Sequence, residues 1–284
     1  MSAPVVIGPL NGDINYPAAF SHMESLSVRL SVWFGRTLSK IANKLIPGKL
    51  HAKVILVSNT RTANALPAGI TGKVVHLVAN AVDLKTWEVP PERAQKELNA
   101  PPRFCFLGRL VDFKMIDLLL KAFAPIAREF DAKLDIIGEG DQRPKLEAQA
   151  KQLGIAANVN FAGWMKYKEA APIMAKSDAM VFPSLRECGG AVVMEAMAVG
   201  LPVIAADWGG PADYVGTDAD GAGMLVKPDT RESFIAGLTA GMRKLAESPE
   251  LRKQMSDSAR QRAVDHFQWE SRVDALLDVY RSLV

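Results

Sequence analysis

The sequence predicts an α/β protein whose main part is a doubly wound parallel sheet. From Pro101 onward short apolar strands alternate with helices, and several of the strands run directly into glycines. This alternation is typical of right-handed βαβ units, in which helices cover both faces of a parallel sheet. Such sheets bind ligands at the carboxyl ends of their strands, so the loops after the strands are where a site is expected.

The first 80 residues or so predict a smaller α/β piece. Apolar runs at 4–8, 52–58 and 74–80 indicate strands, 24–45 indicates a helix, and 60–72 has the composition of a loop.

The regular part then follows in order. Strands are predicted over 103–110, 132–140, 158–163, 179–184 and 201–207. Helices are predicted over 115–130, 143–154, 167–177, 190–200, 231–248, 249–267 and 269–284. Pro125 interrupts an otherwise helical pattern, so we expect a kink or an early end there.

Size and composition set broad limits. A chain of 284 residues is long for one core and suits two unequal parts. Its composition, with 49% hydrophobic and 23% charged residues, is that of a globular protein. Two cysteines far apart indicate neither a disulfide framework nor a zinc site. No apolar run reaches the ~20 residues that cross a bilayer, and the start lacks a signal-peptide pattern, so we expect a cytoplasmic protein.

The loops after the strands carry the candidate chemistry. Arg109 and Lys114 follow the 103–110 strand and offer two positive charges to a diphosphate. Gly189 and Gly190 open a helix, and helix-opening amides bind anions. Glu187 lies just before them, and Glu195 lies within that helix, where a single carboxylate suits the two neighbouring hydroxyls of a ribose.

Together these motifs resemble a known family. "FLGRL" with Lys114, "NAVD" at 80–83, "GEG" at 138–140, "VNFAG", "SDAMVFPS" and the two glutamates of "ECGGAVVMEAMAVGLPVI" occur in an order similar to that of retaining, nucleotide-sugar-dependent glycosyltransferases of the GT-B fold, family 4 in the carbohydrate-enzyme classification. The resemblance covers about residue 75 to the end. It implies a Rossmann-like donor-binding domain over 81–269 and a partial acceptor-side domain over 1–80, with the helix 270–284 packed back onto the latter.

The resemblance also implies roles for particular residues. Catalysis would rest on three side chains: Arg109 and Lys114 holding the donor diphosphate, and Glu187 facing the transferred sugar. The amides of Cys188, Gly189 and Gly190 would contact the sugar and phosphates, Glu195 the ribose, and Gly163, Trp164 and Met165 the base. Family members need no metal or other cofactor, and the acceptor would attack on the face that the diphosphate leaves.

The sequence departs from the family in three places. Lys114-Met115 replaces the usual Lys-Gly, and "NAVD" replaces "NGVD". The family's acceptor-side domain is a complete Rossmann-like unit, whereas residues 1–80 resemble only its second half, so its first strands are expected to be missing.

Residues 21–53 hold six Lys or Arg and a single acid, interleaved with large apolar residues. One interpretation is an amphipathic helix within 28–49 that lies on anionic lipid at the inner face of the cytoplasmic membrane. The other is a helix packed on the acceptor-side sheet with a basic outer face. In a truncated acceptor-side domain, the apolar face of this helix would simply be exposed. Binding of nucleic acid is not expected, because no recognisable module is present.

The sequence therefore predicts a retaining glycosyltransferase that moves a sugar from a nucleotide diphosphate to a glycan or lipid-linked acceptor in an envelope polysaccharide pathway. The alternative is a non-catalytic nucleotide-sugar-binding fragment or subunit that needs a second chain. A GT-B epimerase or phosphorylase is a third reading, and no lysine for pyridoxal phosphate is apparent.

Overall fold

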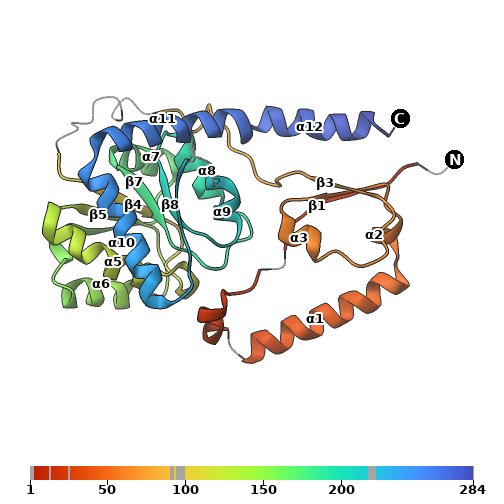
Figure 1. The fold of residues 1–284 in the computed structure, drawn as a ribbon, viewed down its shortest axis with the longest axis horizontal. Coiled ribbons are helices and arrows are strands. Elements are labelled where there is room, and N and C mark those ends of the chain that lie inside the picture. Colours follow the sequence, from red (N-terminus) through yellow and green to blue (C-terminus); the bar gives the residue numbers. More distant parts are fainter. Residues whose placement is uncertain are drawn as a thin grey trace.

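The computed structural model of the chain describes residues 3–12, 14–24, 26–89, 93, 100–216 and 222–283. Figure 1 shows a small part around β1, β2 and β3, a larger α/β part, and the C-terminal helices α11 and α12 running along both.

The small part is a parallel sheet with the strand order β1-β2-β3. β1 spans Val6–Leu10, β2 Val54–Val57 and β3 Lys73–His76. Between β1 and β2 the chain forms the 3-10 helix η1 (Ala18–Met23), the long helix α1 (Leu26–Leu45) and α2 (Gly48–His51), and α3 (Thr60–Asn64) follows β2. Among the described residues, none of the helices is both long and apolar enough to cross a membrane.

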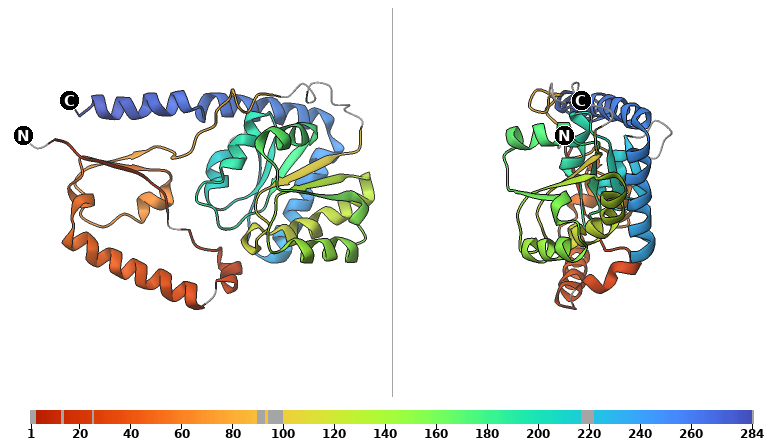
Figure 2. Two further views of the ribbon diagram at one scale, coloured as in Figure 1. Left: turned by 180° about the vertical axis from the view of Figure 1, so that it is seen from behind. Right: turned by 90° about the vertical axis from the view of Figure 1, so that its left-hand side faces the viewer.

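The larger part is a six-stranded sheet in which every pairing is parallel, in the order β6-β5-β4-β7-β8-β9. Its strands are β4 (Arg103–Leu107), β5 (Lys133–Ile137), β6 (Val159–Gly163), β7 (Ala179–Phe182), β8 (Val203–Ala206) and β9 (Gly223–Val226). Its helices are η2 (Asp112–Lys114), α5 (Ile116–Phe130), α6 (Arg143–Gln152), η3 (Ala156–Asn158), α7 (Tyr167–Lys176), α8 (Ala191–Ala198), α9 (Gly210–Val215), α10 (Arg231–Glu247), α11 (Pro249–His266) and α12 (Trp269–Arg281). Helices lie on both faces of the sheet (Figure 2), so the predicted doubly wound architecture is confirmed.

Four local predictions differ from the structure. The loop predicted over 60–72 contains α3, which begins where the Asn59 side chain accepts a hydrogen bond from the Thr62 amide at 2.8 Å. Neither α9 nor β9 was predicted, because α9 opens on a Gly-Gly-Pro run and β9 follows a run rich in Asp and Gly. β3 ends at His76, short of the predicted 80.

Of the kink or early end predicted at Pro125, the early end is wrong, since α5 continues to Phe130. Packing explains this. Helix α10 lies along α5, and the Thr239 hydroxyl donates to the Ala122 carbonyl at 3.0 Å, one turn before the proline. Helix α5 thus continues past the missing proline N–H while packed along α10.

Two segments cross between the parts. In η1, Phe20 is buried in the core of the larger part and lies edge-on to Phe234, with ring centroids 6.2 Å apart. Helix α12 crosses in the other direction, and its Leu276 and Val279, with Leu283 just after it, pack against the β1–β3 sheet around the buried Leu56.

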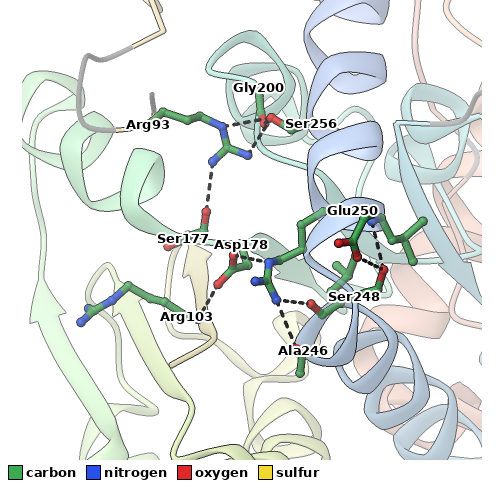
Figure 3. A network of polar contacts seen from close by, with 12 residues as sticks. Arg93, Arg103, Ser177, Asp178, Gly200, Ala246, Ser248, Glu250 and Ser256 are labelled. Carbon is green, nitrogen blue, oxygen red and sulfur yellow. Dashed lines mark hydrogen bonds and ion pairs between the residues drawn. The ribbon is translucent and has the colours of Figure 1, made fainter. Parts of the chain in front are cut away.

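Arginines bind the carboxyl ends of helices at the amino edge of the larger sheet (Figure 3). Arg93 donates to the Ser177 carbonyl (3.0 Å) after α7, and Arg252 to the Leu245 carbonyl (2.7 Å) in the last turn of α10. Asp178 pairs with Arg252 at 3.0 Å. Burial lowers the pKa of Arg93 to about 10, which leaves it charged at neutral pH. These bonds satisfy carbonyls that helix ends leave without partners.

Candidate active site

The strand order places a switch point between β4 and β7. The chain continues from β4 to β5 and β6 on one side and from β7 to β8 and β9 on the other, so the loops after β4 and β7 diverge at the carboxyl edge. Crevices of this kind are where open α/β sheets bind ligands. The two loops are joined directly, because the Leu185 amide donates to the Phe113 carbonyl at 3.0 Å.

Lys114 and Glu187 meet at this switch point. The Lys114 ammonium forms an ion pair with Glu187 Oε1, and their side chains are only 11% and 15% exposed. The Ser184 hydroxyl lies 3.1 Å from the same Glu187 oxygen, and the Phe182 ring lies 4.7 Å below Lys114 Nζ. A desolvated cation and carboxylate are therefore held together where two of the predicted catalytic residues were expected to act.

Met115 explains how Lys114 reaches this position. Its φ of 55° is left-handed, and its carbonyl accepts the Leu118 and Leu119 amides that begin α5. The backbone turns sharply at this residue, which sends the preceding lysine toward β7. The sequence departure from Lys-Gly thus falls on a position whose conformation favours glycine.

Arg109 lies apart from the pair. Its side chain is exposed at the carboxyl end of β4 and makes no hydrogen bond or ion pair with any other described residue. It is available to a ligand at the edge, but no contact in the structure joins it to Lys114 or Glu187.

The loop 187–190 packs against the loop after β8. The Gly210 amide donates to the Glu187 carbonyl at 3.0 Å, and a Cβ on Gly210 would lie 2.5 Å from the Cys188 carbonyl oxygen. A Cβ on Gly189 would lie 2.4 Å from the Asn80 amide nitrogen. Gly210 is therefore required by its close approach to backbone, and the Asn80 side chain of "NAVD" lies directly on the loop at Gly189.

Helix α8 begins after Gly190, whose φ is 74°, and no side chain caps its first turn. The opening amides of α8 thus retain donors for a ligand at the end of the helix that favours anions. Cys188 precedes them. Partial desolvation and the Glu187 carboxylate raise the pKa of its thiol, which does not favour a thiolate nucleophile.

Glu195 lies within α8, is half-buried, and has no hydrogen bond or ion pair to another described residue. Burial alone raises the pKa of its carboxyl group. The structure thus separates the two glutamates by environment, because Glu187 is paired and Glu195 has unsatisfied acceptor oxygens that a ligand's hydroxyls would suit.

Gly163, Trp164 and Met165 lie at the carboxyl end of β6, two strands away from β4. The Gly163 carbonyl accepts the Gly138 amide at 2.8 Å, which ties this edge to the glycine loop after β5. Trp164 is 69% exposed and Met165 packs partly on the core. The three residues therefore form one end of the carboxyl edge, with the Lys114–Glu187 pair toward its middle.

Sequence reasoning missed the side chains that reach this edge from the N-terminal part. The Trp208 indole donates to the Asn15 carbonyl at 2.9 Å, and the Arg186 guanidinium lies over the Tyr16 ring at 5.7 Å. Burial raises the pKa of the Tyr16 hydroxyl, with Arg186 opposing that effect. Segment 14–16 thus lies beside the residue that precedes Glu187, and no spacing or periodicity in a single sequence signals such a contact.

Within the described ranges, no three His, Cys, Asp or Glu side chains gather closely enough to hold a metal ion.

Comparisons with known proteins agree with this geometry. The family model described as "Glycosyl transferases group 1" matches residues 89–262. The chain is 26% identical over 253 residues to the MMP alpha-(1->4)-mannosyltransferase of Mycolicibacterium hassiacum, over 89% of this chain and 58% of that protein. It is 33% identical over 220 residues to the D-inositol 3-phosphate glycosyltransferase of Rhodococcus opacus, over 73% and 48% respectively.

A solved structure, Anabaena HepE in complex with UDP, matches with a TM-score of 0.70 and 20% identity over 88% of this chain and 68% of that one. The chain spans about half to three fifths of the length of the two curated relatives. The family match covers more than half of the chain, and the fold agrees with it. The chain therefore belongs to the glycosyl transferases group 1 family and has the Rossmann-like GT-B fold that its motifs predicted.

Proposed function

We propose that the chain binds a nucleotide-diphosphate sugar and transfers the sugar, with retention of anomeric configuration, to a hydroxyl of a glycan or lipid-linked acceptor. The observation that carries the proposal is the Lys114–Glu187 pair at the switch point, beside the uncapped amino end of α8. Membership of the glycosyl transferases group 1 family supports it. The UDP complex of HepE supports a nucleotide donor.

The donor would lie along the carboxyl edge. Lys114, Arg109 and the amides of 188–190 would neutralise the diphosphate, since charge-assisted bonds from cations and helix amides suit phosphate oxygens. Glu195 would accept the two ribose hydroxyls, and the exposed Trp164 offers the base a flat surface at the far end of the edge. We expect no metal requirement, because these groups supply the positive charge.

In the proposed reaction the acceptor oxygen attacks the anomeric carbon on the face from which the diphosphate departs. The bond from that carbon to the phosphate oxygen breaks, and the acceptor's proton passes to the leaving phosphate. Lys114 and the α8 amides stabilise the charge that grows on the diphosphate, and Glu187 orients the sugar hydroxyls. The protein thus acts by positioning and electrostatics, without a covalent intermediate.

The acceptor would approach from the N-terminal part, where Tyr16 and Arg186 flank the site. We place the reaction at the inner face of the cytoplasmic membrane in an envelope polysaccharide pathway, with peripheral contact through residues 28–49. Two observations support this placement: the exposed apolar side of α1 and the excess of basic residues in that segment.

A second candidate function is nucleotide-sugar binding without turnover, in a subunit completed by further polypeptide. It is favoured by the small sheet, where no described strand pairs with the outer edge of β1, and by the length of the relatives. In that case binding of the donor would survive and transfer would require the partner.

Titration calorimetry of the full chain with UDP, GDP and ADP, without metal, tests both candidates. Selective binding of one nucleotide that weakens in Glu195→Ala, followed by release or transfer of sugar from its sugar derivatives, is the expected result. Binding without turnover would select the second candidate. A folded chain that binds none of the three would refute both.

A further inference from the structure

The loop 187–190 turns its carbonyl groups toward the loop after β8. The Gly210 amide donates to the Glu187 carbonyl at 3.0 Å, and a Cβ on Gly210 would lie 2.5 Å from the carbonyl oxygens of both Cys188 and Gly189. Three successive carbonyls therefore lie against one glycine. In a trans peptide the carbonyl and the following N–H point in opposite directions, so the amides of 188–190 point away from that glycine.

Those three amides donate to no other group in the part of the chain that the structure describes. Successive N–H groups that point to one side form a concavity that binds anions. Such a concavity depends on the shape of the backbone, and two of the three residues are glycines, which have no side chain to anchor the loop. The support must therefore come from other segments.

Two side chains contact the middle of the loop. A Cβ on Gly189 would lie 2.4 Å from the Asn80 amide nitrogen and 3.0 Å from the Tyr214 hydroxyl oxygen. Both groups thus lie where a side chain of Gly189 would be. Burial raises the pKa of the Tyr214 hydroxyl, with Asn80 opposing that effect, so the hydroxyl is protonated at neutral pH.

Tyr214 is held firmly in α9. It is buried, its ring lies edge-on to Phe267 with centroids 5.5 Å apart, and its carbonyl accepts a hydrogen bond from Arg262 Nε at 2.7 Å. Helix α9 begins at Gly210, the residue that faces the carbonyls of the loop. One short helix therefore contacts the loop twice, at its carbonyls and at Gly189.

Asn80 belongs to the segment that connects the two parts. Two residues further on, the Val82 amide donates to the Phe267 carbonyl at 2.7 Å, and Val82 forms a parallel bridge with Gln268 just before α12. The two crossings between the parts are therefore joined beside Asn80. Through this side chain the loop 187–190 is in contact with the connection to the small part.

We propose that Asn80 and Tyr214 are positioning residues, which hold the amides of 188–190 in the arrangement that receives the donor diphosphate. They act through the backbone of Gly189. The proposal rests on the proposed function for the diphosphate, and it deepens that function by assigning to phosphate binding two residues that lie outside the loop.

Paired titrations with UDP and uridine test the proposal, because uridine has the same base and ribose without the diphosphate. Tyr214→Phe and Asn80→Ala should each weaken UDP binding about 5- to 10-fold, the effect of one net hydrogen bond, and change uridine binding less than about twofold. Tyr280→Phe removes an exposed hydroxyl in α12 and is the matched control, which should change neither. Equal losses for both ligands, or an unchanged UDP affinity, would overturn the proposal.

Gly189→Ala supplies a second test. The φ of Gly189 is not positive, so alanine fits its backbone, but the new methyl group would displace the Asn80 amide. Gly189→Ala should therefore weaken UDP binding about as much as Asn80→Ala does, and the double variant should bind within about twofold of either single variant. Additive losses would show that Asn80 does not act through Gly189.

Alkylation of Cys188 by iodoacetamide reports on the loop without any nucleotide, because Cys188 is exposed and Cys105 is buried. Its rate should rise at least threefold in Tyr214→Phe and Asn80→Ala and stay the same in Tyr280→Phe. Unchanged rates in a chain that binds UDP would refute the positioning role alone. A wild type that binds none of UDP, GDP and ADP would refute the proposed function and this proposal together.

Discussion

Lys114 and Glu187 form an ion pair between the loops that follow β4 and β7, with both side chains largely buried. The pair holds a cation where the donor diphosphate is proposed to bind, but it also occupies that cation with a carboxylate. A bound diphosphate would therefore compete with Glu187 for Lys114. This gives the two residues opposite effects on nucleotide affinity.

Replacing Lys114 with Ala should weaken UDP binding by about 10- to 100-fold, because a charge-assisted hydrogen bond to phosphate contributes about 1.5–3 kcal/mol. Glu187→Gln should leave UDP affinity unchanged or raise it, since Lys114 is then released, while abolishing sugar transfer. Titration calorimetry and a turnover assay measure the two effects. Lys121→Ala, on the exposed side of α5, is the control. Parallel losses of UDP affinity in Lys114→Ala and Glu187→Gln would contradict the competition.

Glu195 should make stability and binding depend on pH in opposite directions. Burial raises its carboxyl pKa above the ordinary 4.5, so the folded state holds the proton more tightly than the unfolded state. Its contribution to stability is thus full below about 4.5 and is lost as pH rises through the folded pKa. Urea denaturation of wild type and Glu195→Gln from pH 4 to 8 should show this loss in the wild type alone.

Nucleotide binding should change the other way, because ribose hydroxyls donate to the ionised carboxylate. UDP affinity of the wild type is expected to fall as pH drops through that pKa, and Glu195→Gln should bind about 10-fold more weakly and with less pH dependence. If UDP binding by the wild type and by Glu195→Gln had the same pH profile, the result would show that Glu195 does not contact the nucleotide.

The sheet of the larger part was predictable because its signals are local. Apolar runs such as 179–184 are bounded by polar or glycine residues, and their alternation with helices along the chain indicates a doubly wound sheet. The meeting of Lys114 and Glu187 follows from that topology, since both come after strands that flank the switch point. β9 was missed because it follows a run rich in Asp and Gly, which has the composition of a loop.

What the sequence could not predict depends on contacts between distant segments. The burial of Phe20 against Phe234 and the cover of Arg186 over Tyr16 join residues far apart in the chain. The orientation of α1 could not be predicted either, because periodicity identifies an apolar side without saying what that side faces. The exposure of side chains such as Leu38 and Ile41 shows that the apolar side points outward.

Met115 should give an unusual order of stability among its variants. Its buried side chain stabilises the fold, but its left-handed backbone costs about 1 kcal/mol for any residue except glycine. Met115→Ala keeps the strain and loses the contacts, with an expected cost of about 2–5 kcal/mol, and Met115→Gly should be about 1 kcal/mol more stable than Met115→Ala. At Lys121, an exposed residue inside helix α5, the order should reverse, and Lys121→Gly should be about 1 kcal/mol less stable than Lys121→Ala. Urea unfolding curves compare the stabilities of the four variants. If Met115→Ala were more stable than Met115→Gly, the result would contradict the role of the backbone.

Asp178 is expected to determine stability without affecting the donor site. It lies at the amino end of β7, the opposite edge of the sheet from Lys114, and pairs with Arg252 where both side chains are under 10% exposed. Asp178→Asn leaves the buried guanidinium without its counter-charge, so the free energy of unfolding should fall by about 3–5 kcal/mol. The exposed Asp257, which pairs with Lys253, provides a control with the same chemical change, and Asp257→Asn should cost less than about 0.5 kcal/mol.

UDP affinity measured well below the melting temperature should be unchanged in both variants, because the site is built from the carboxyl ends of the strands. If Asp178→Asn instead lowered UDP affinity in a fully folded protein, the two edges would be coupled, and the arginine network would have to be treated as part of the donor site.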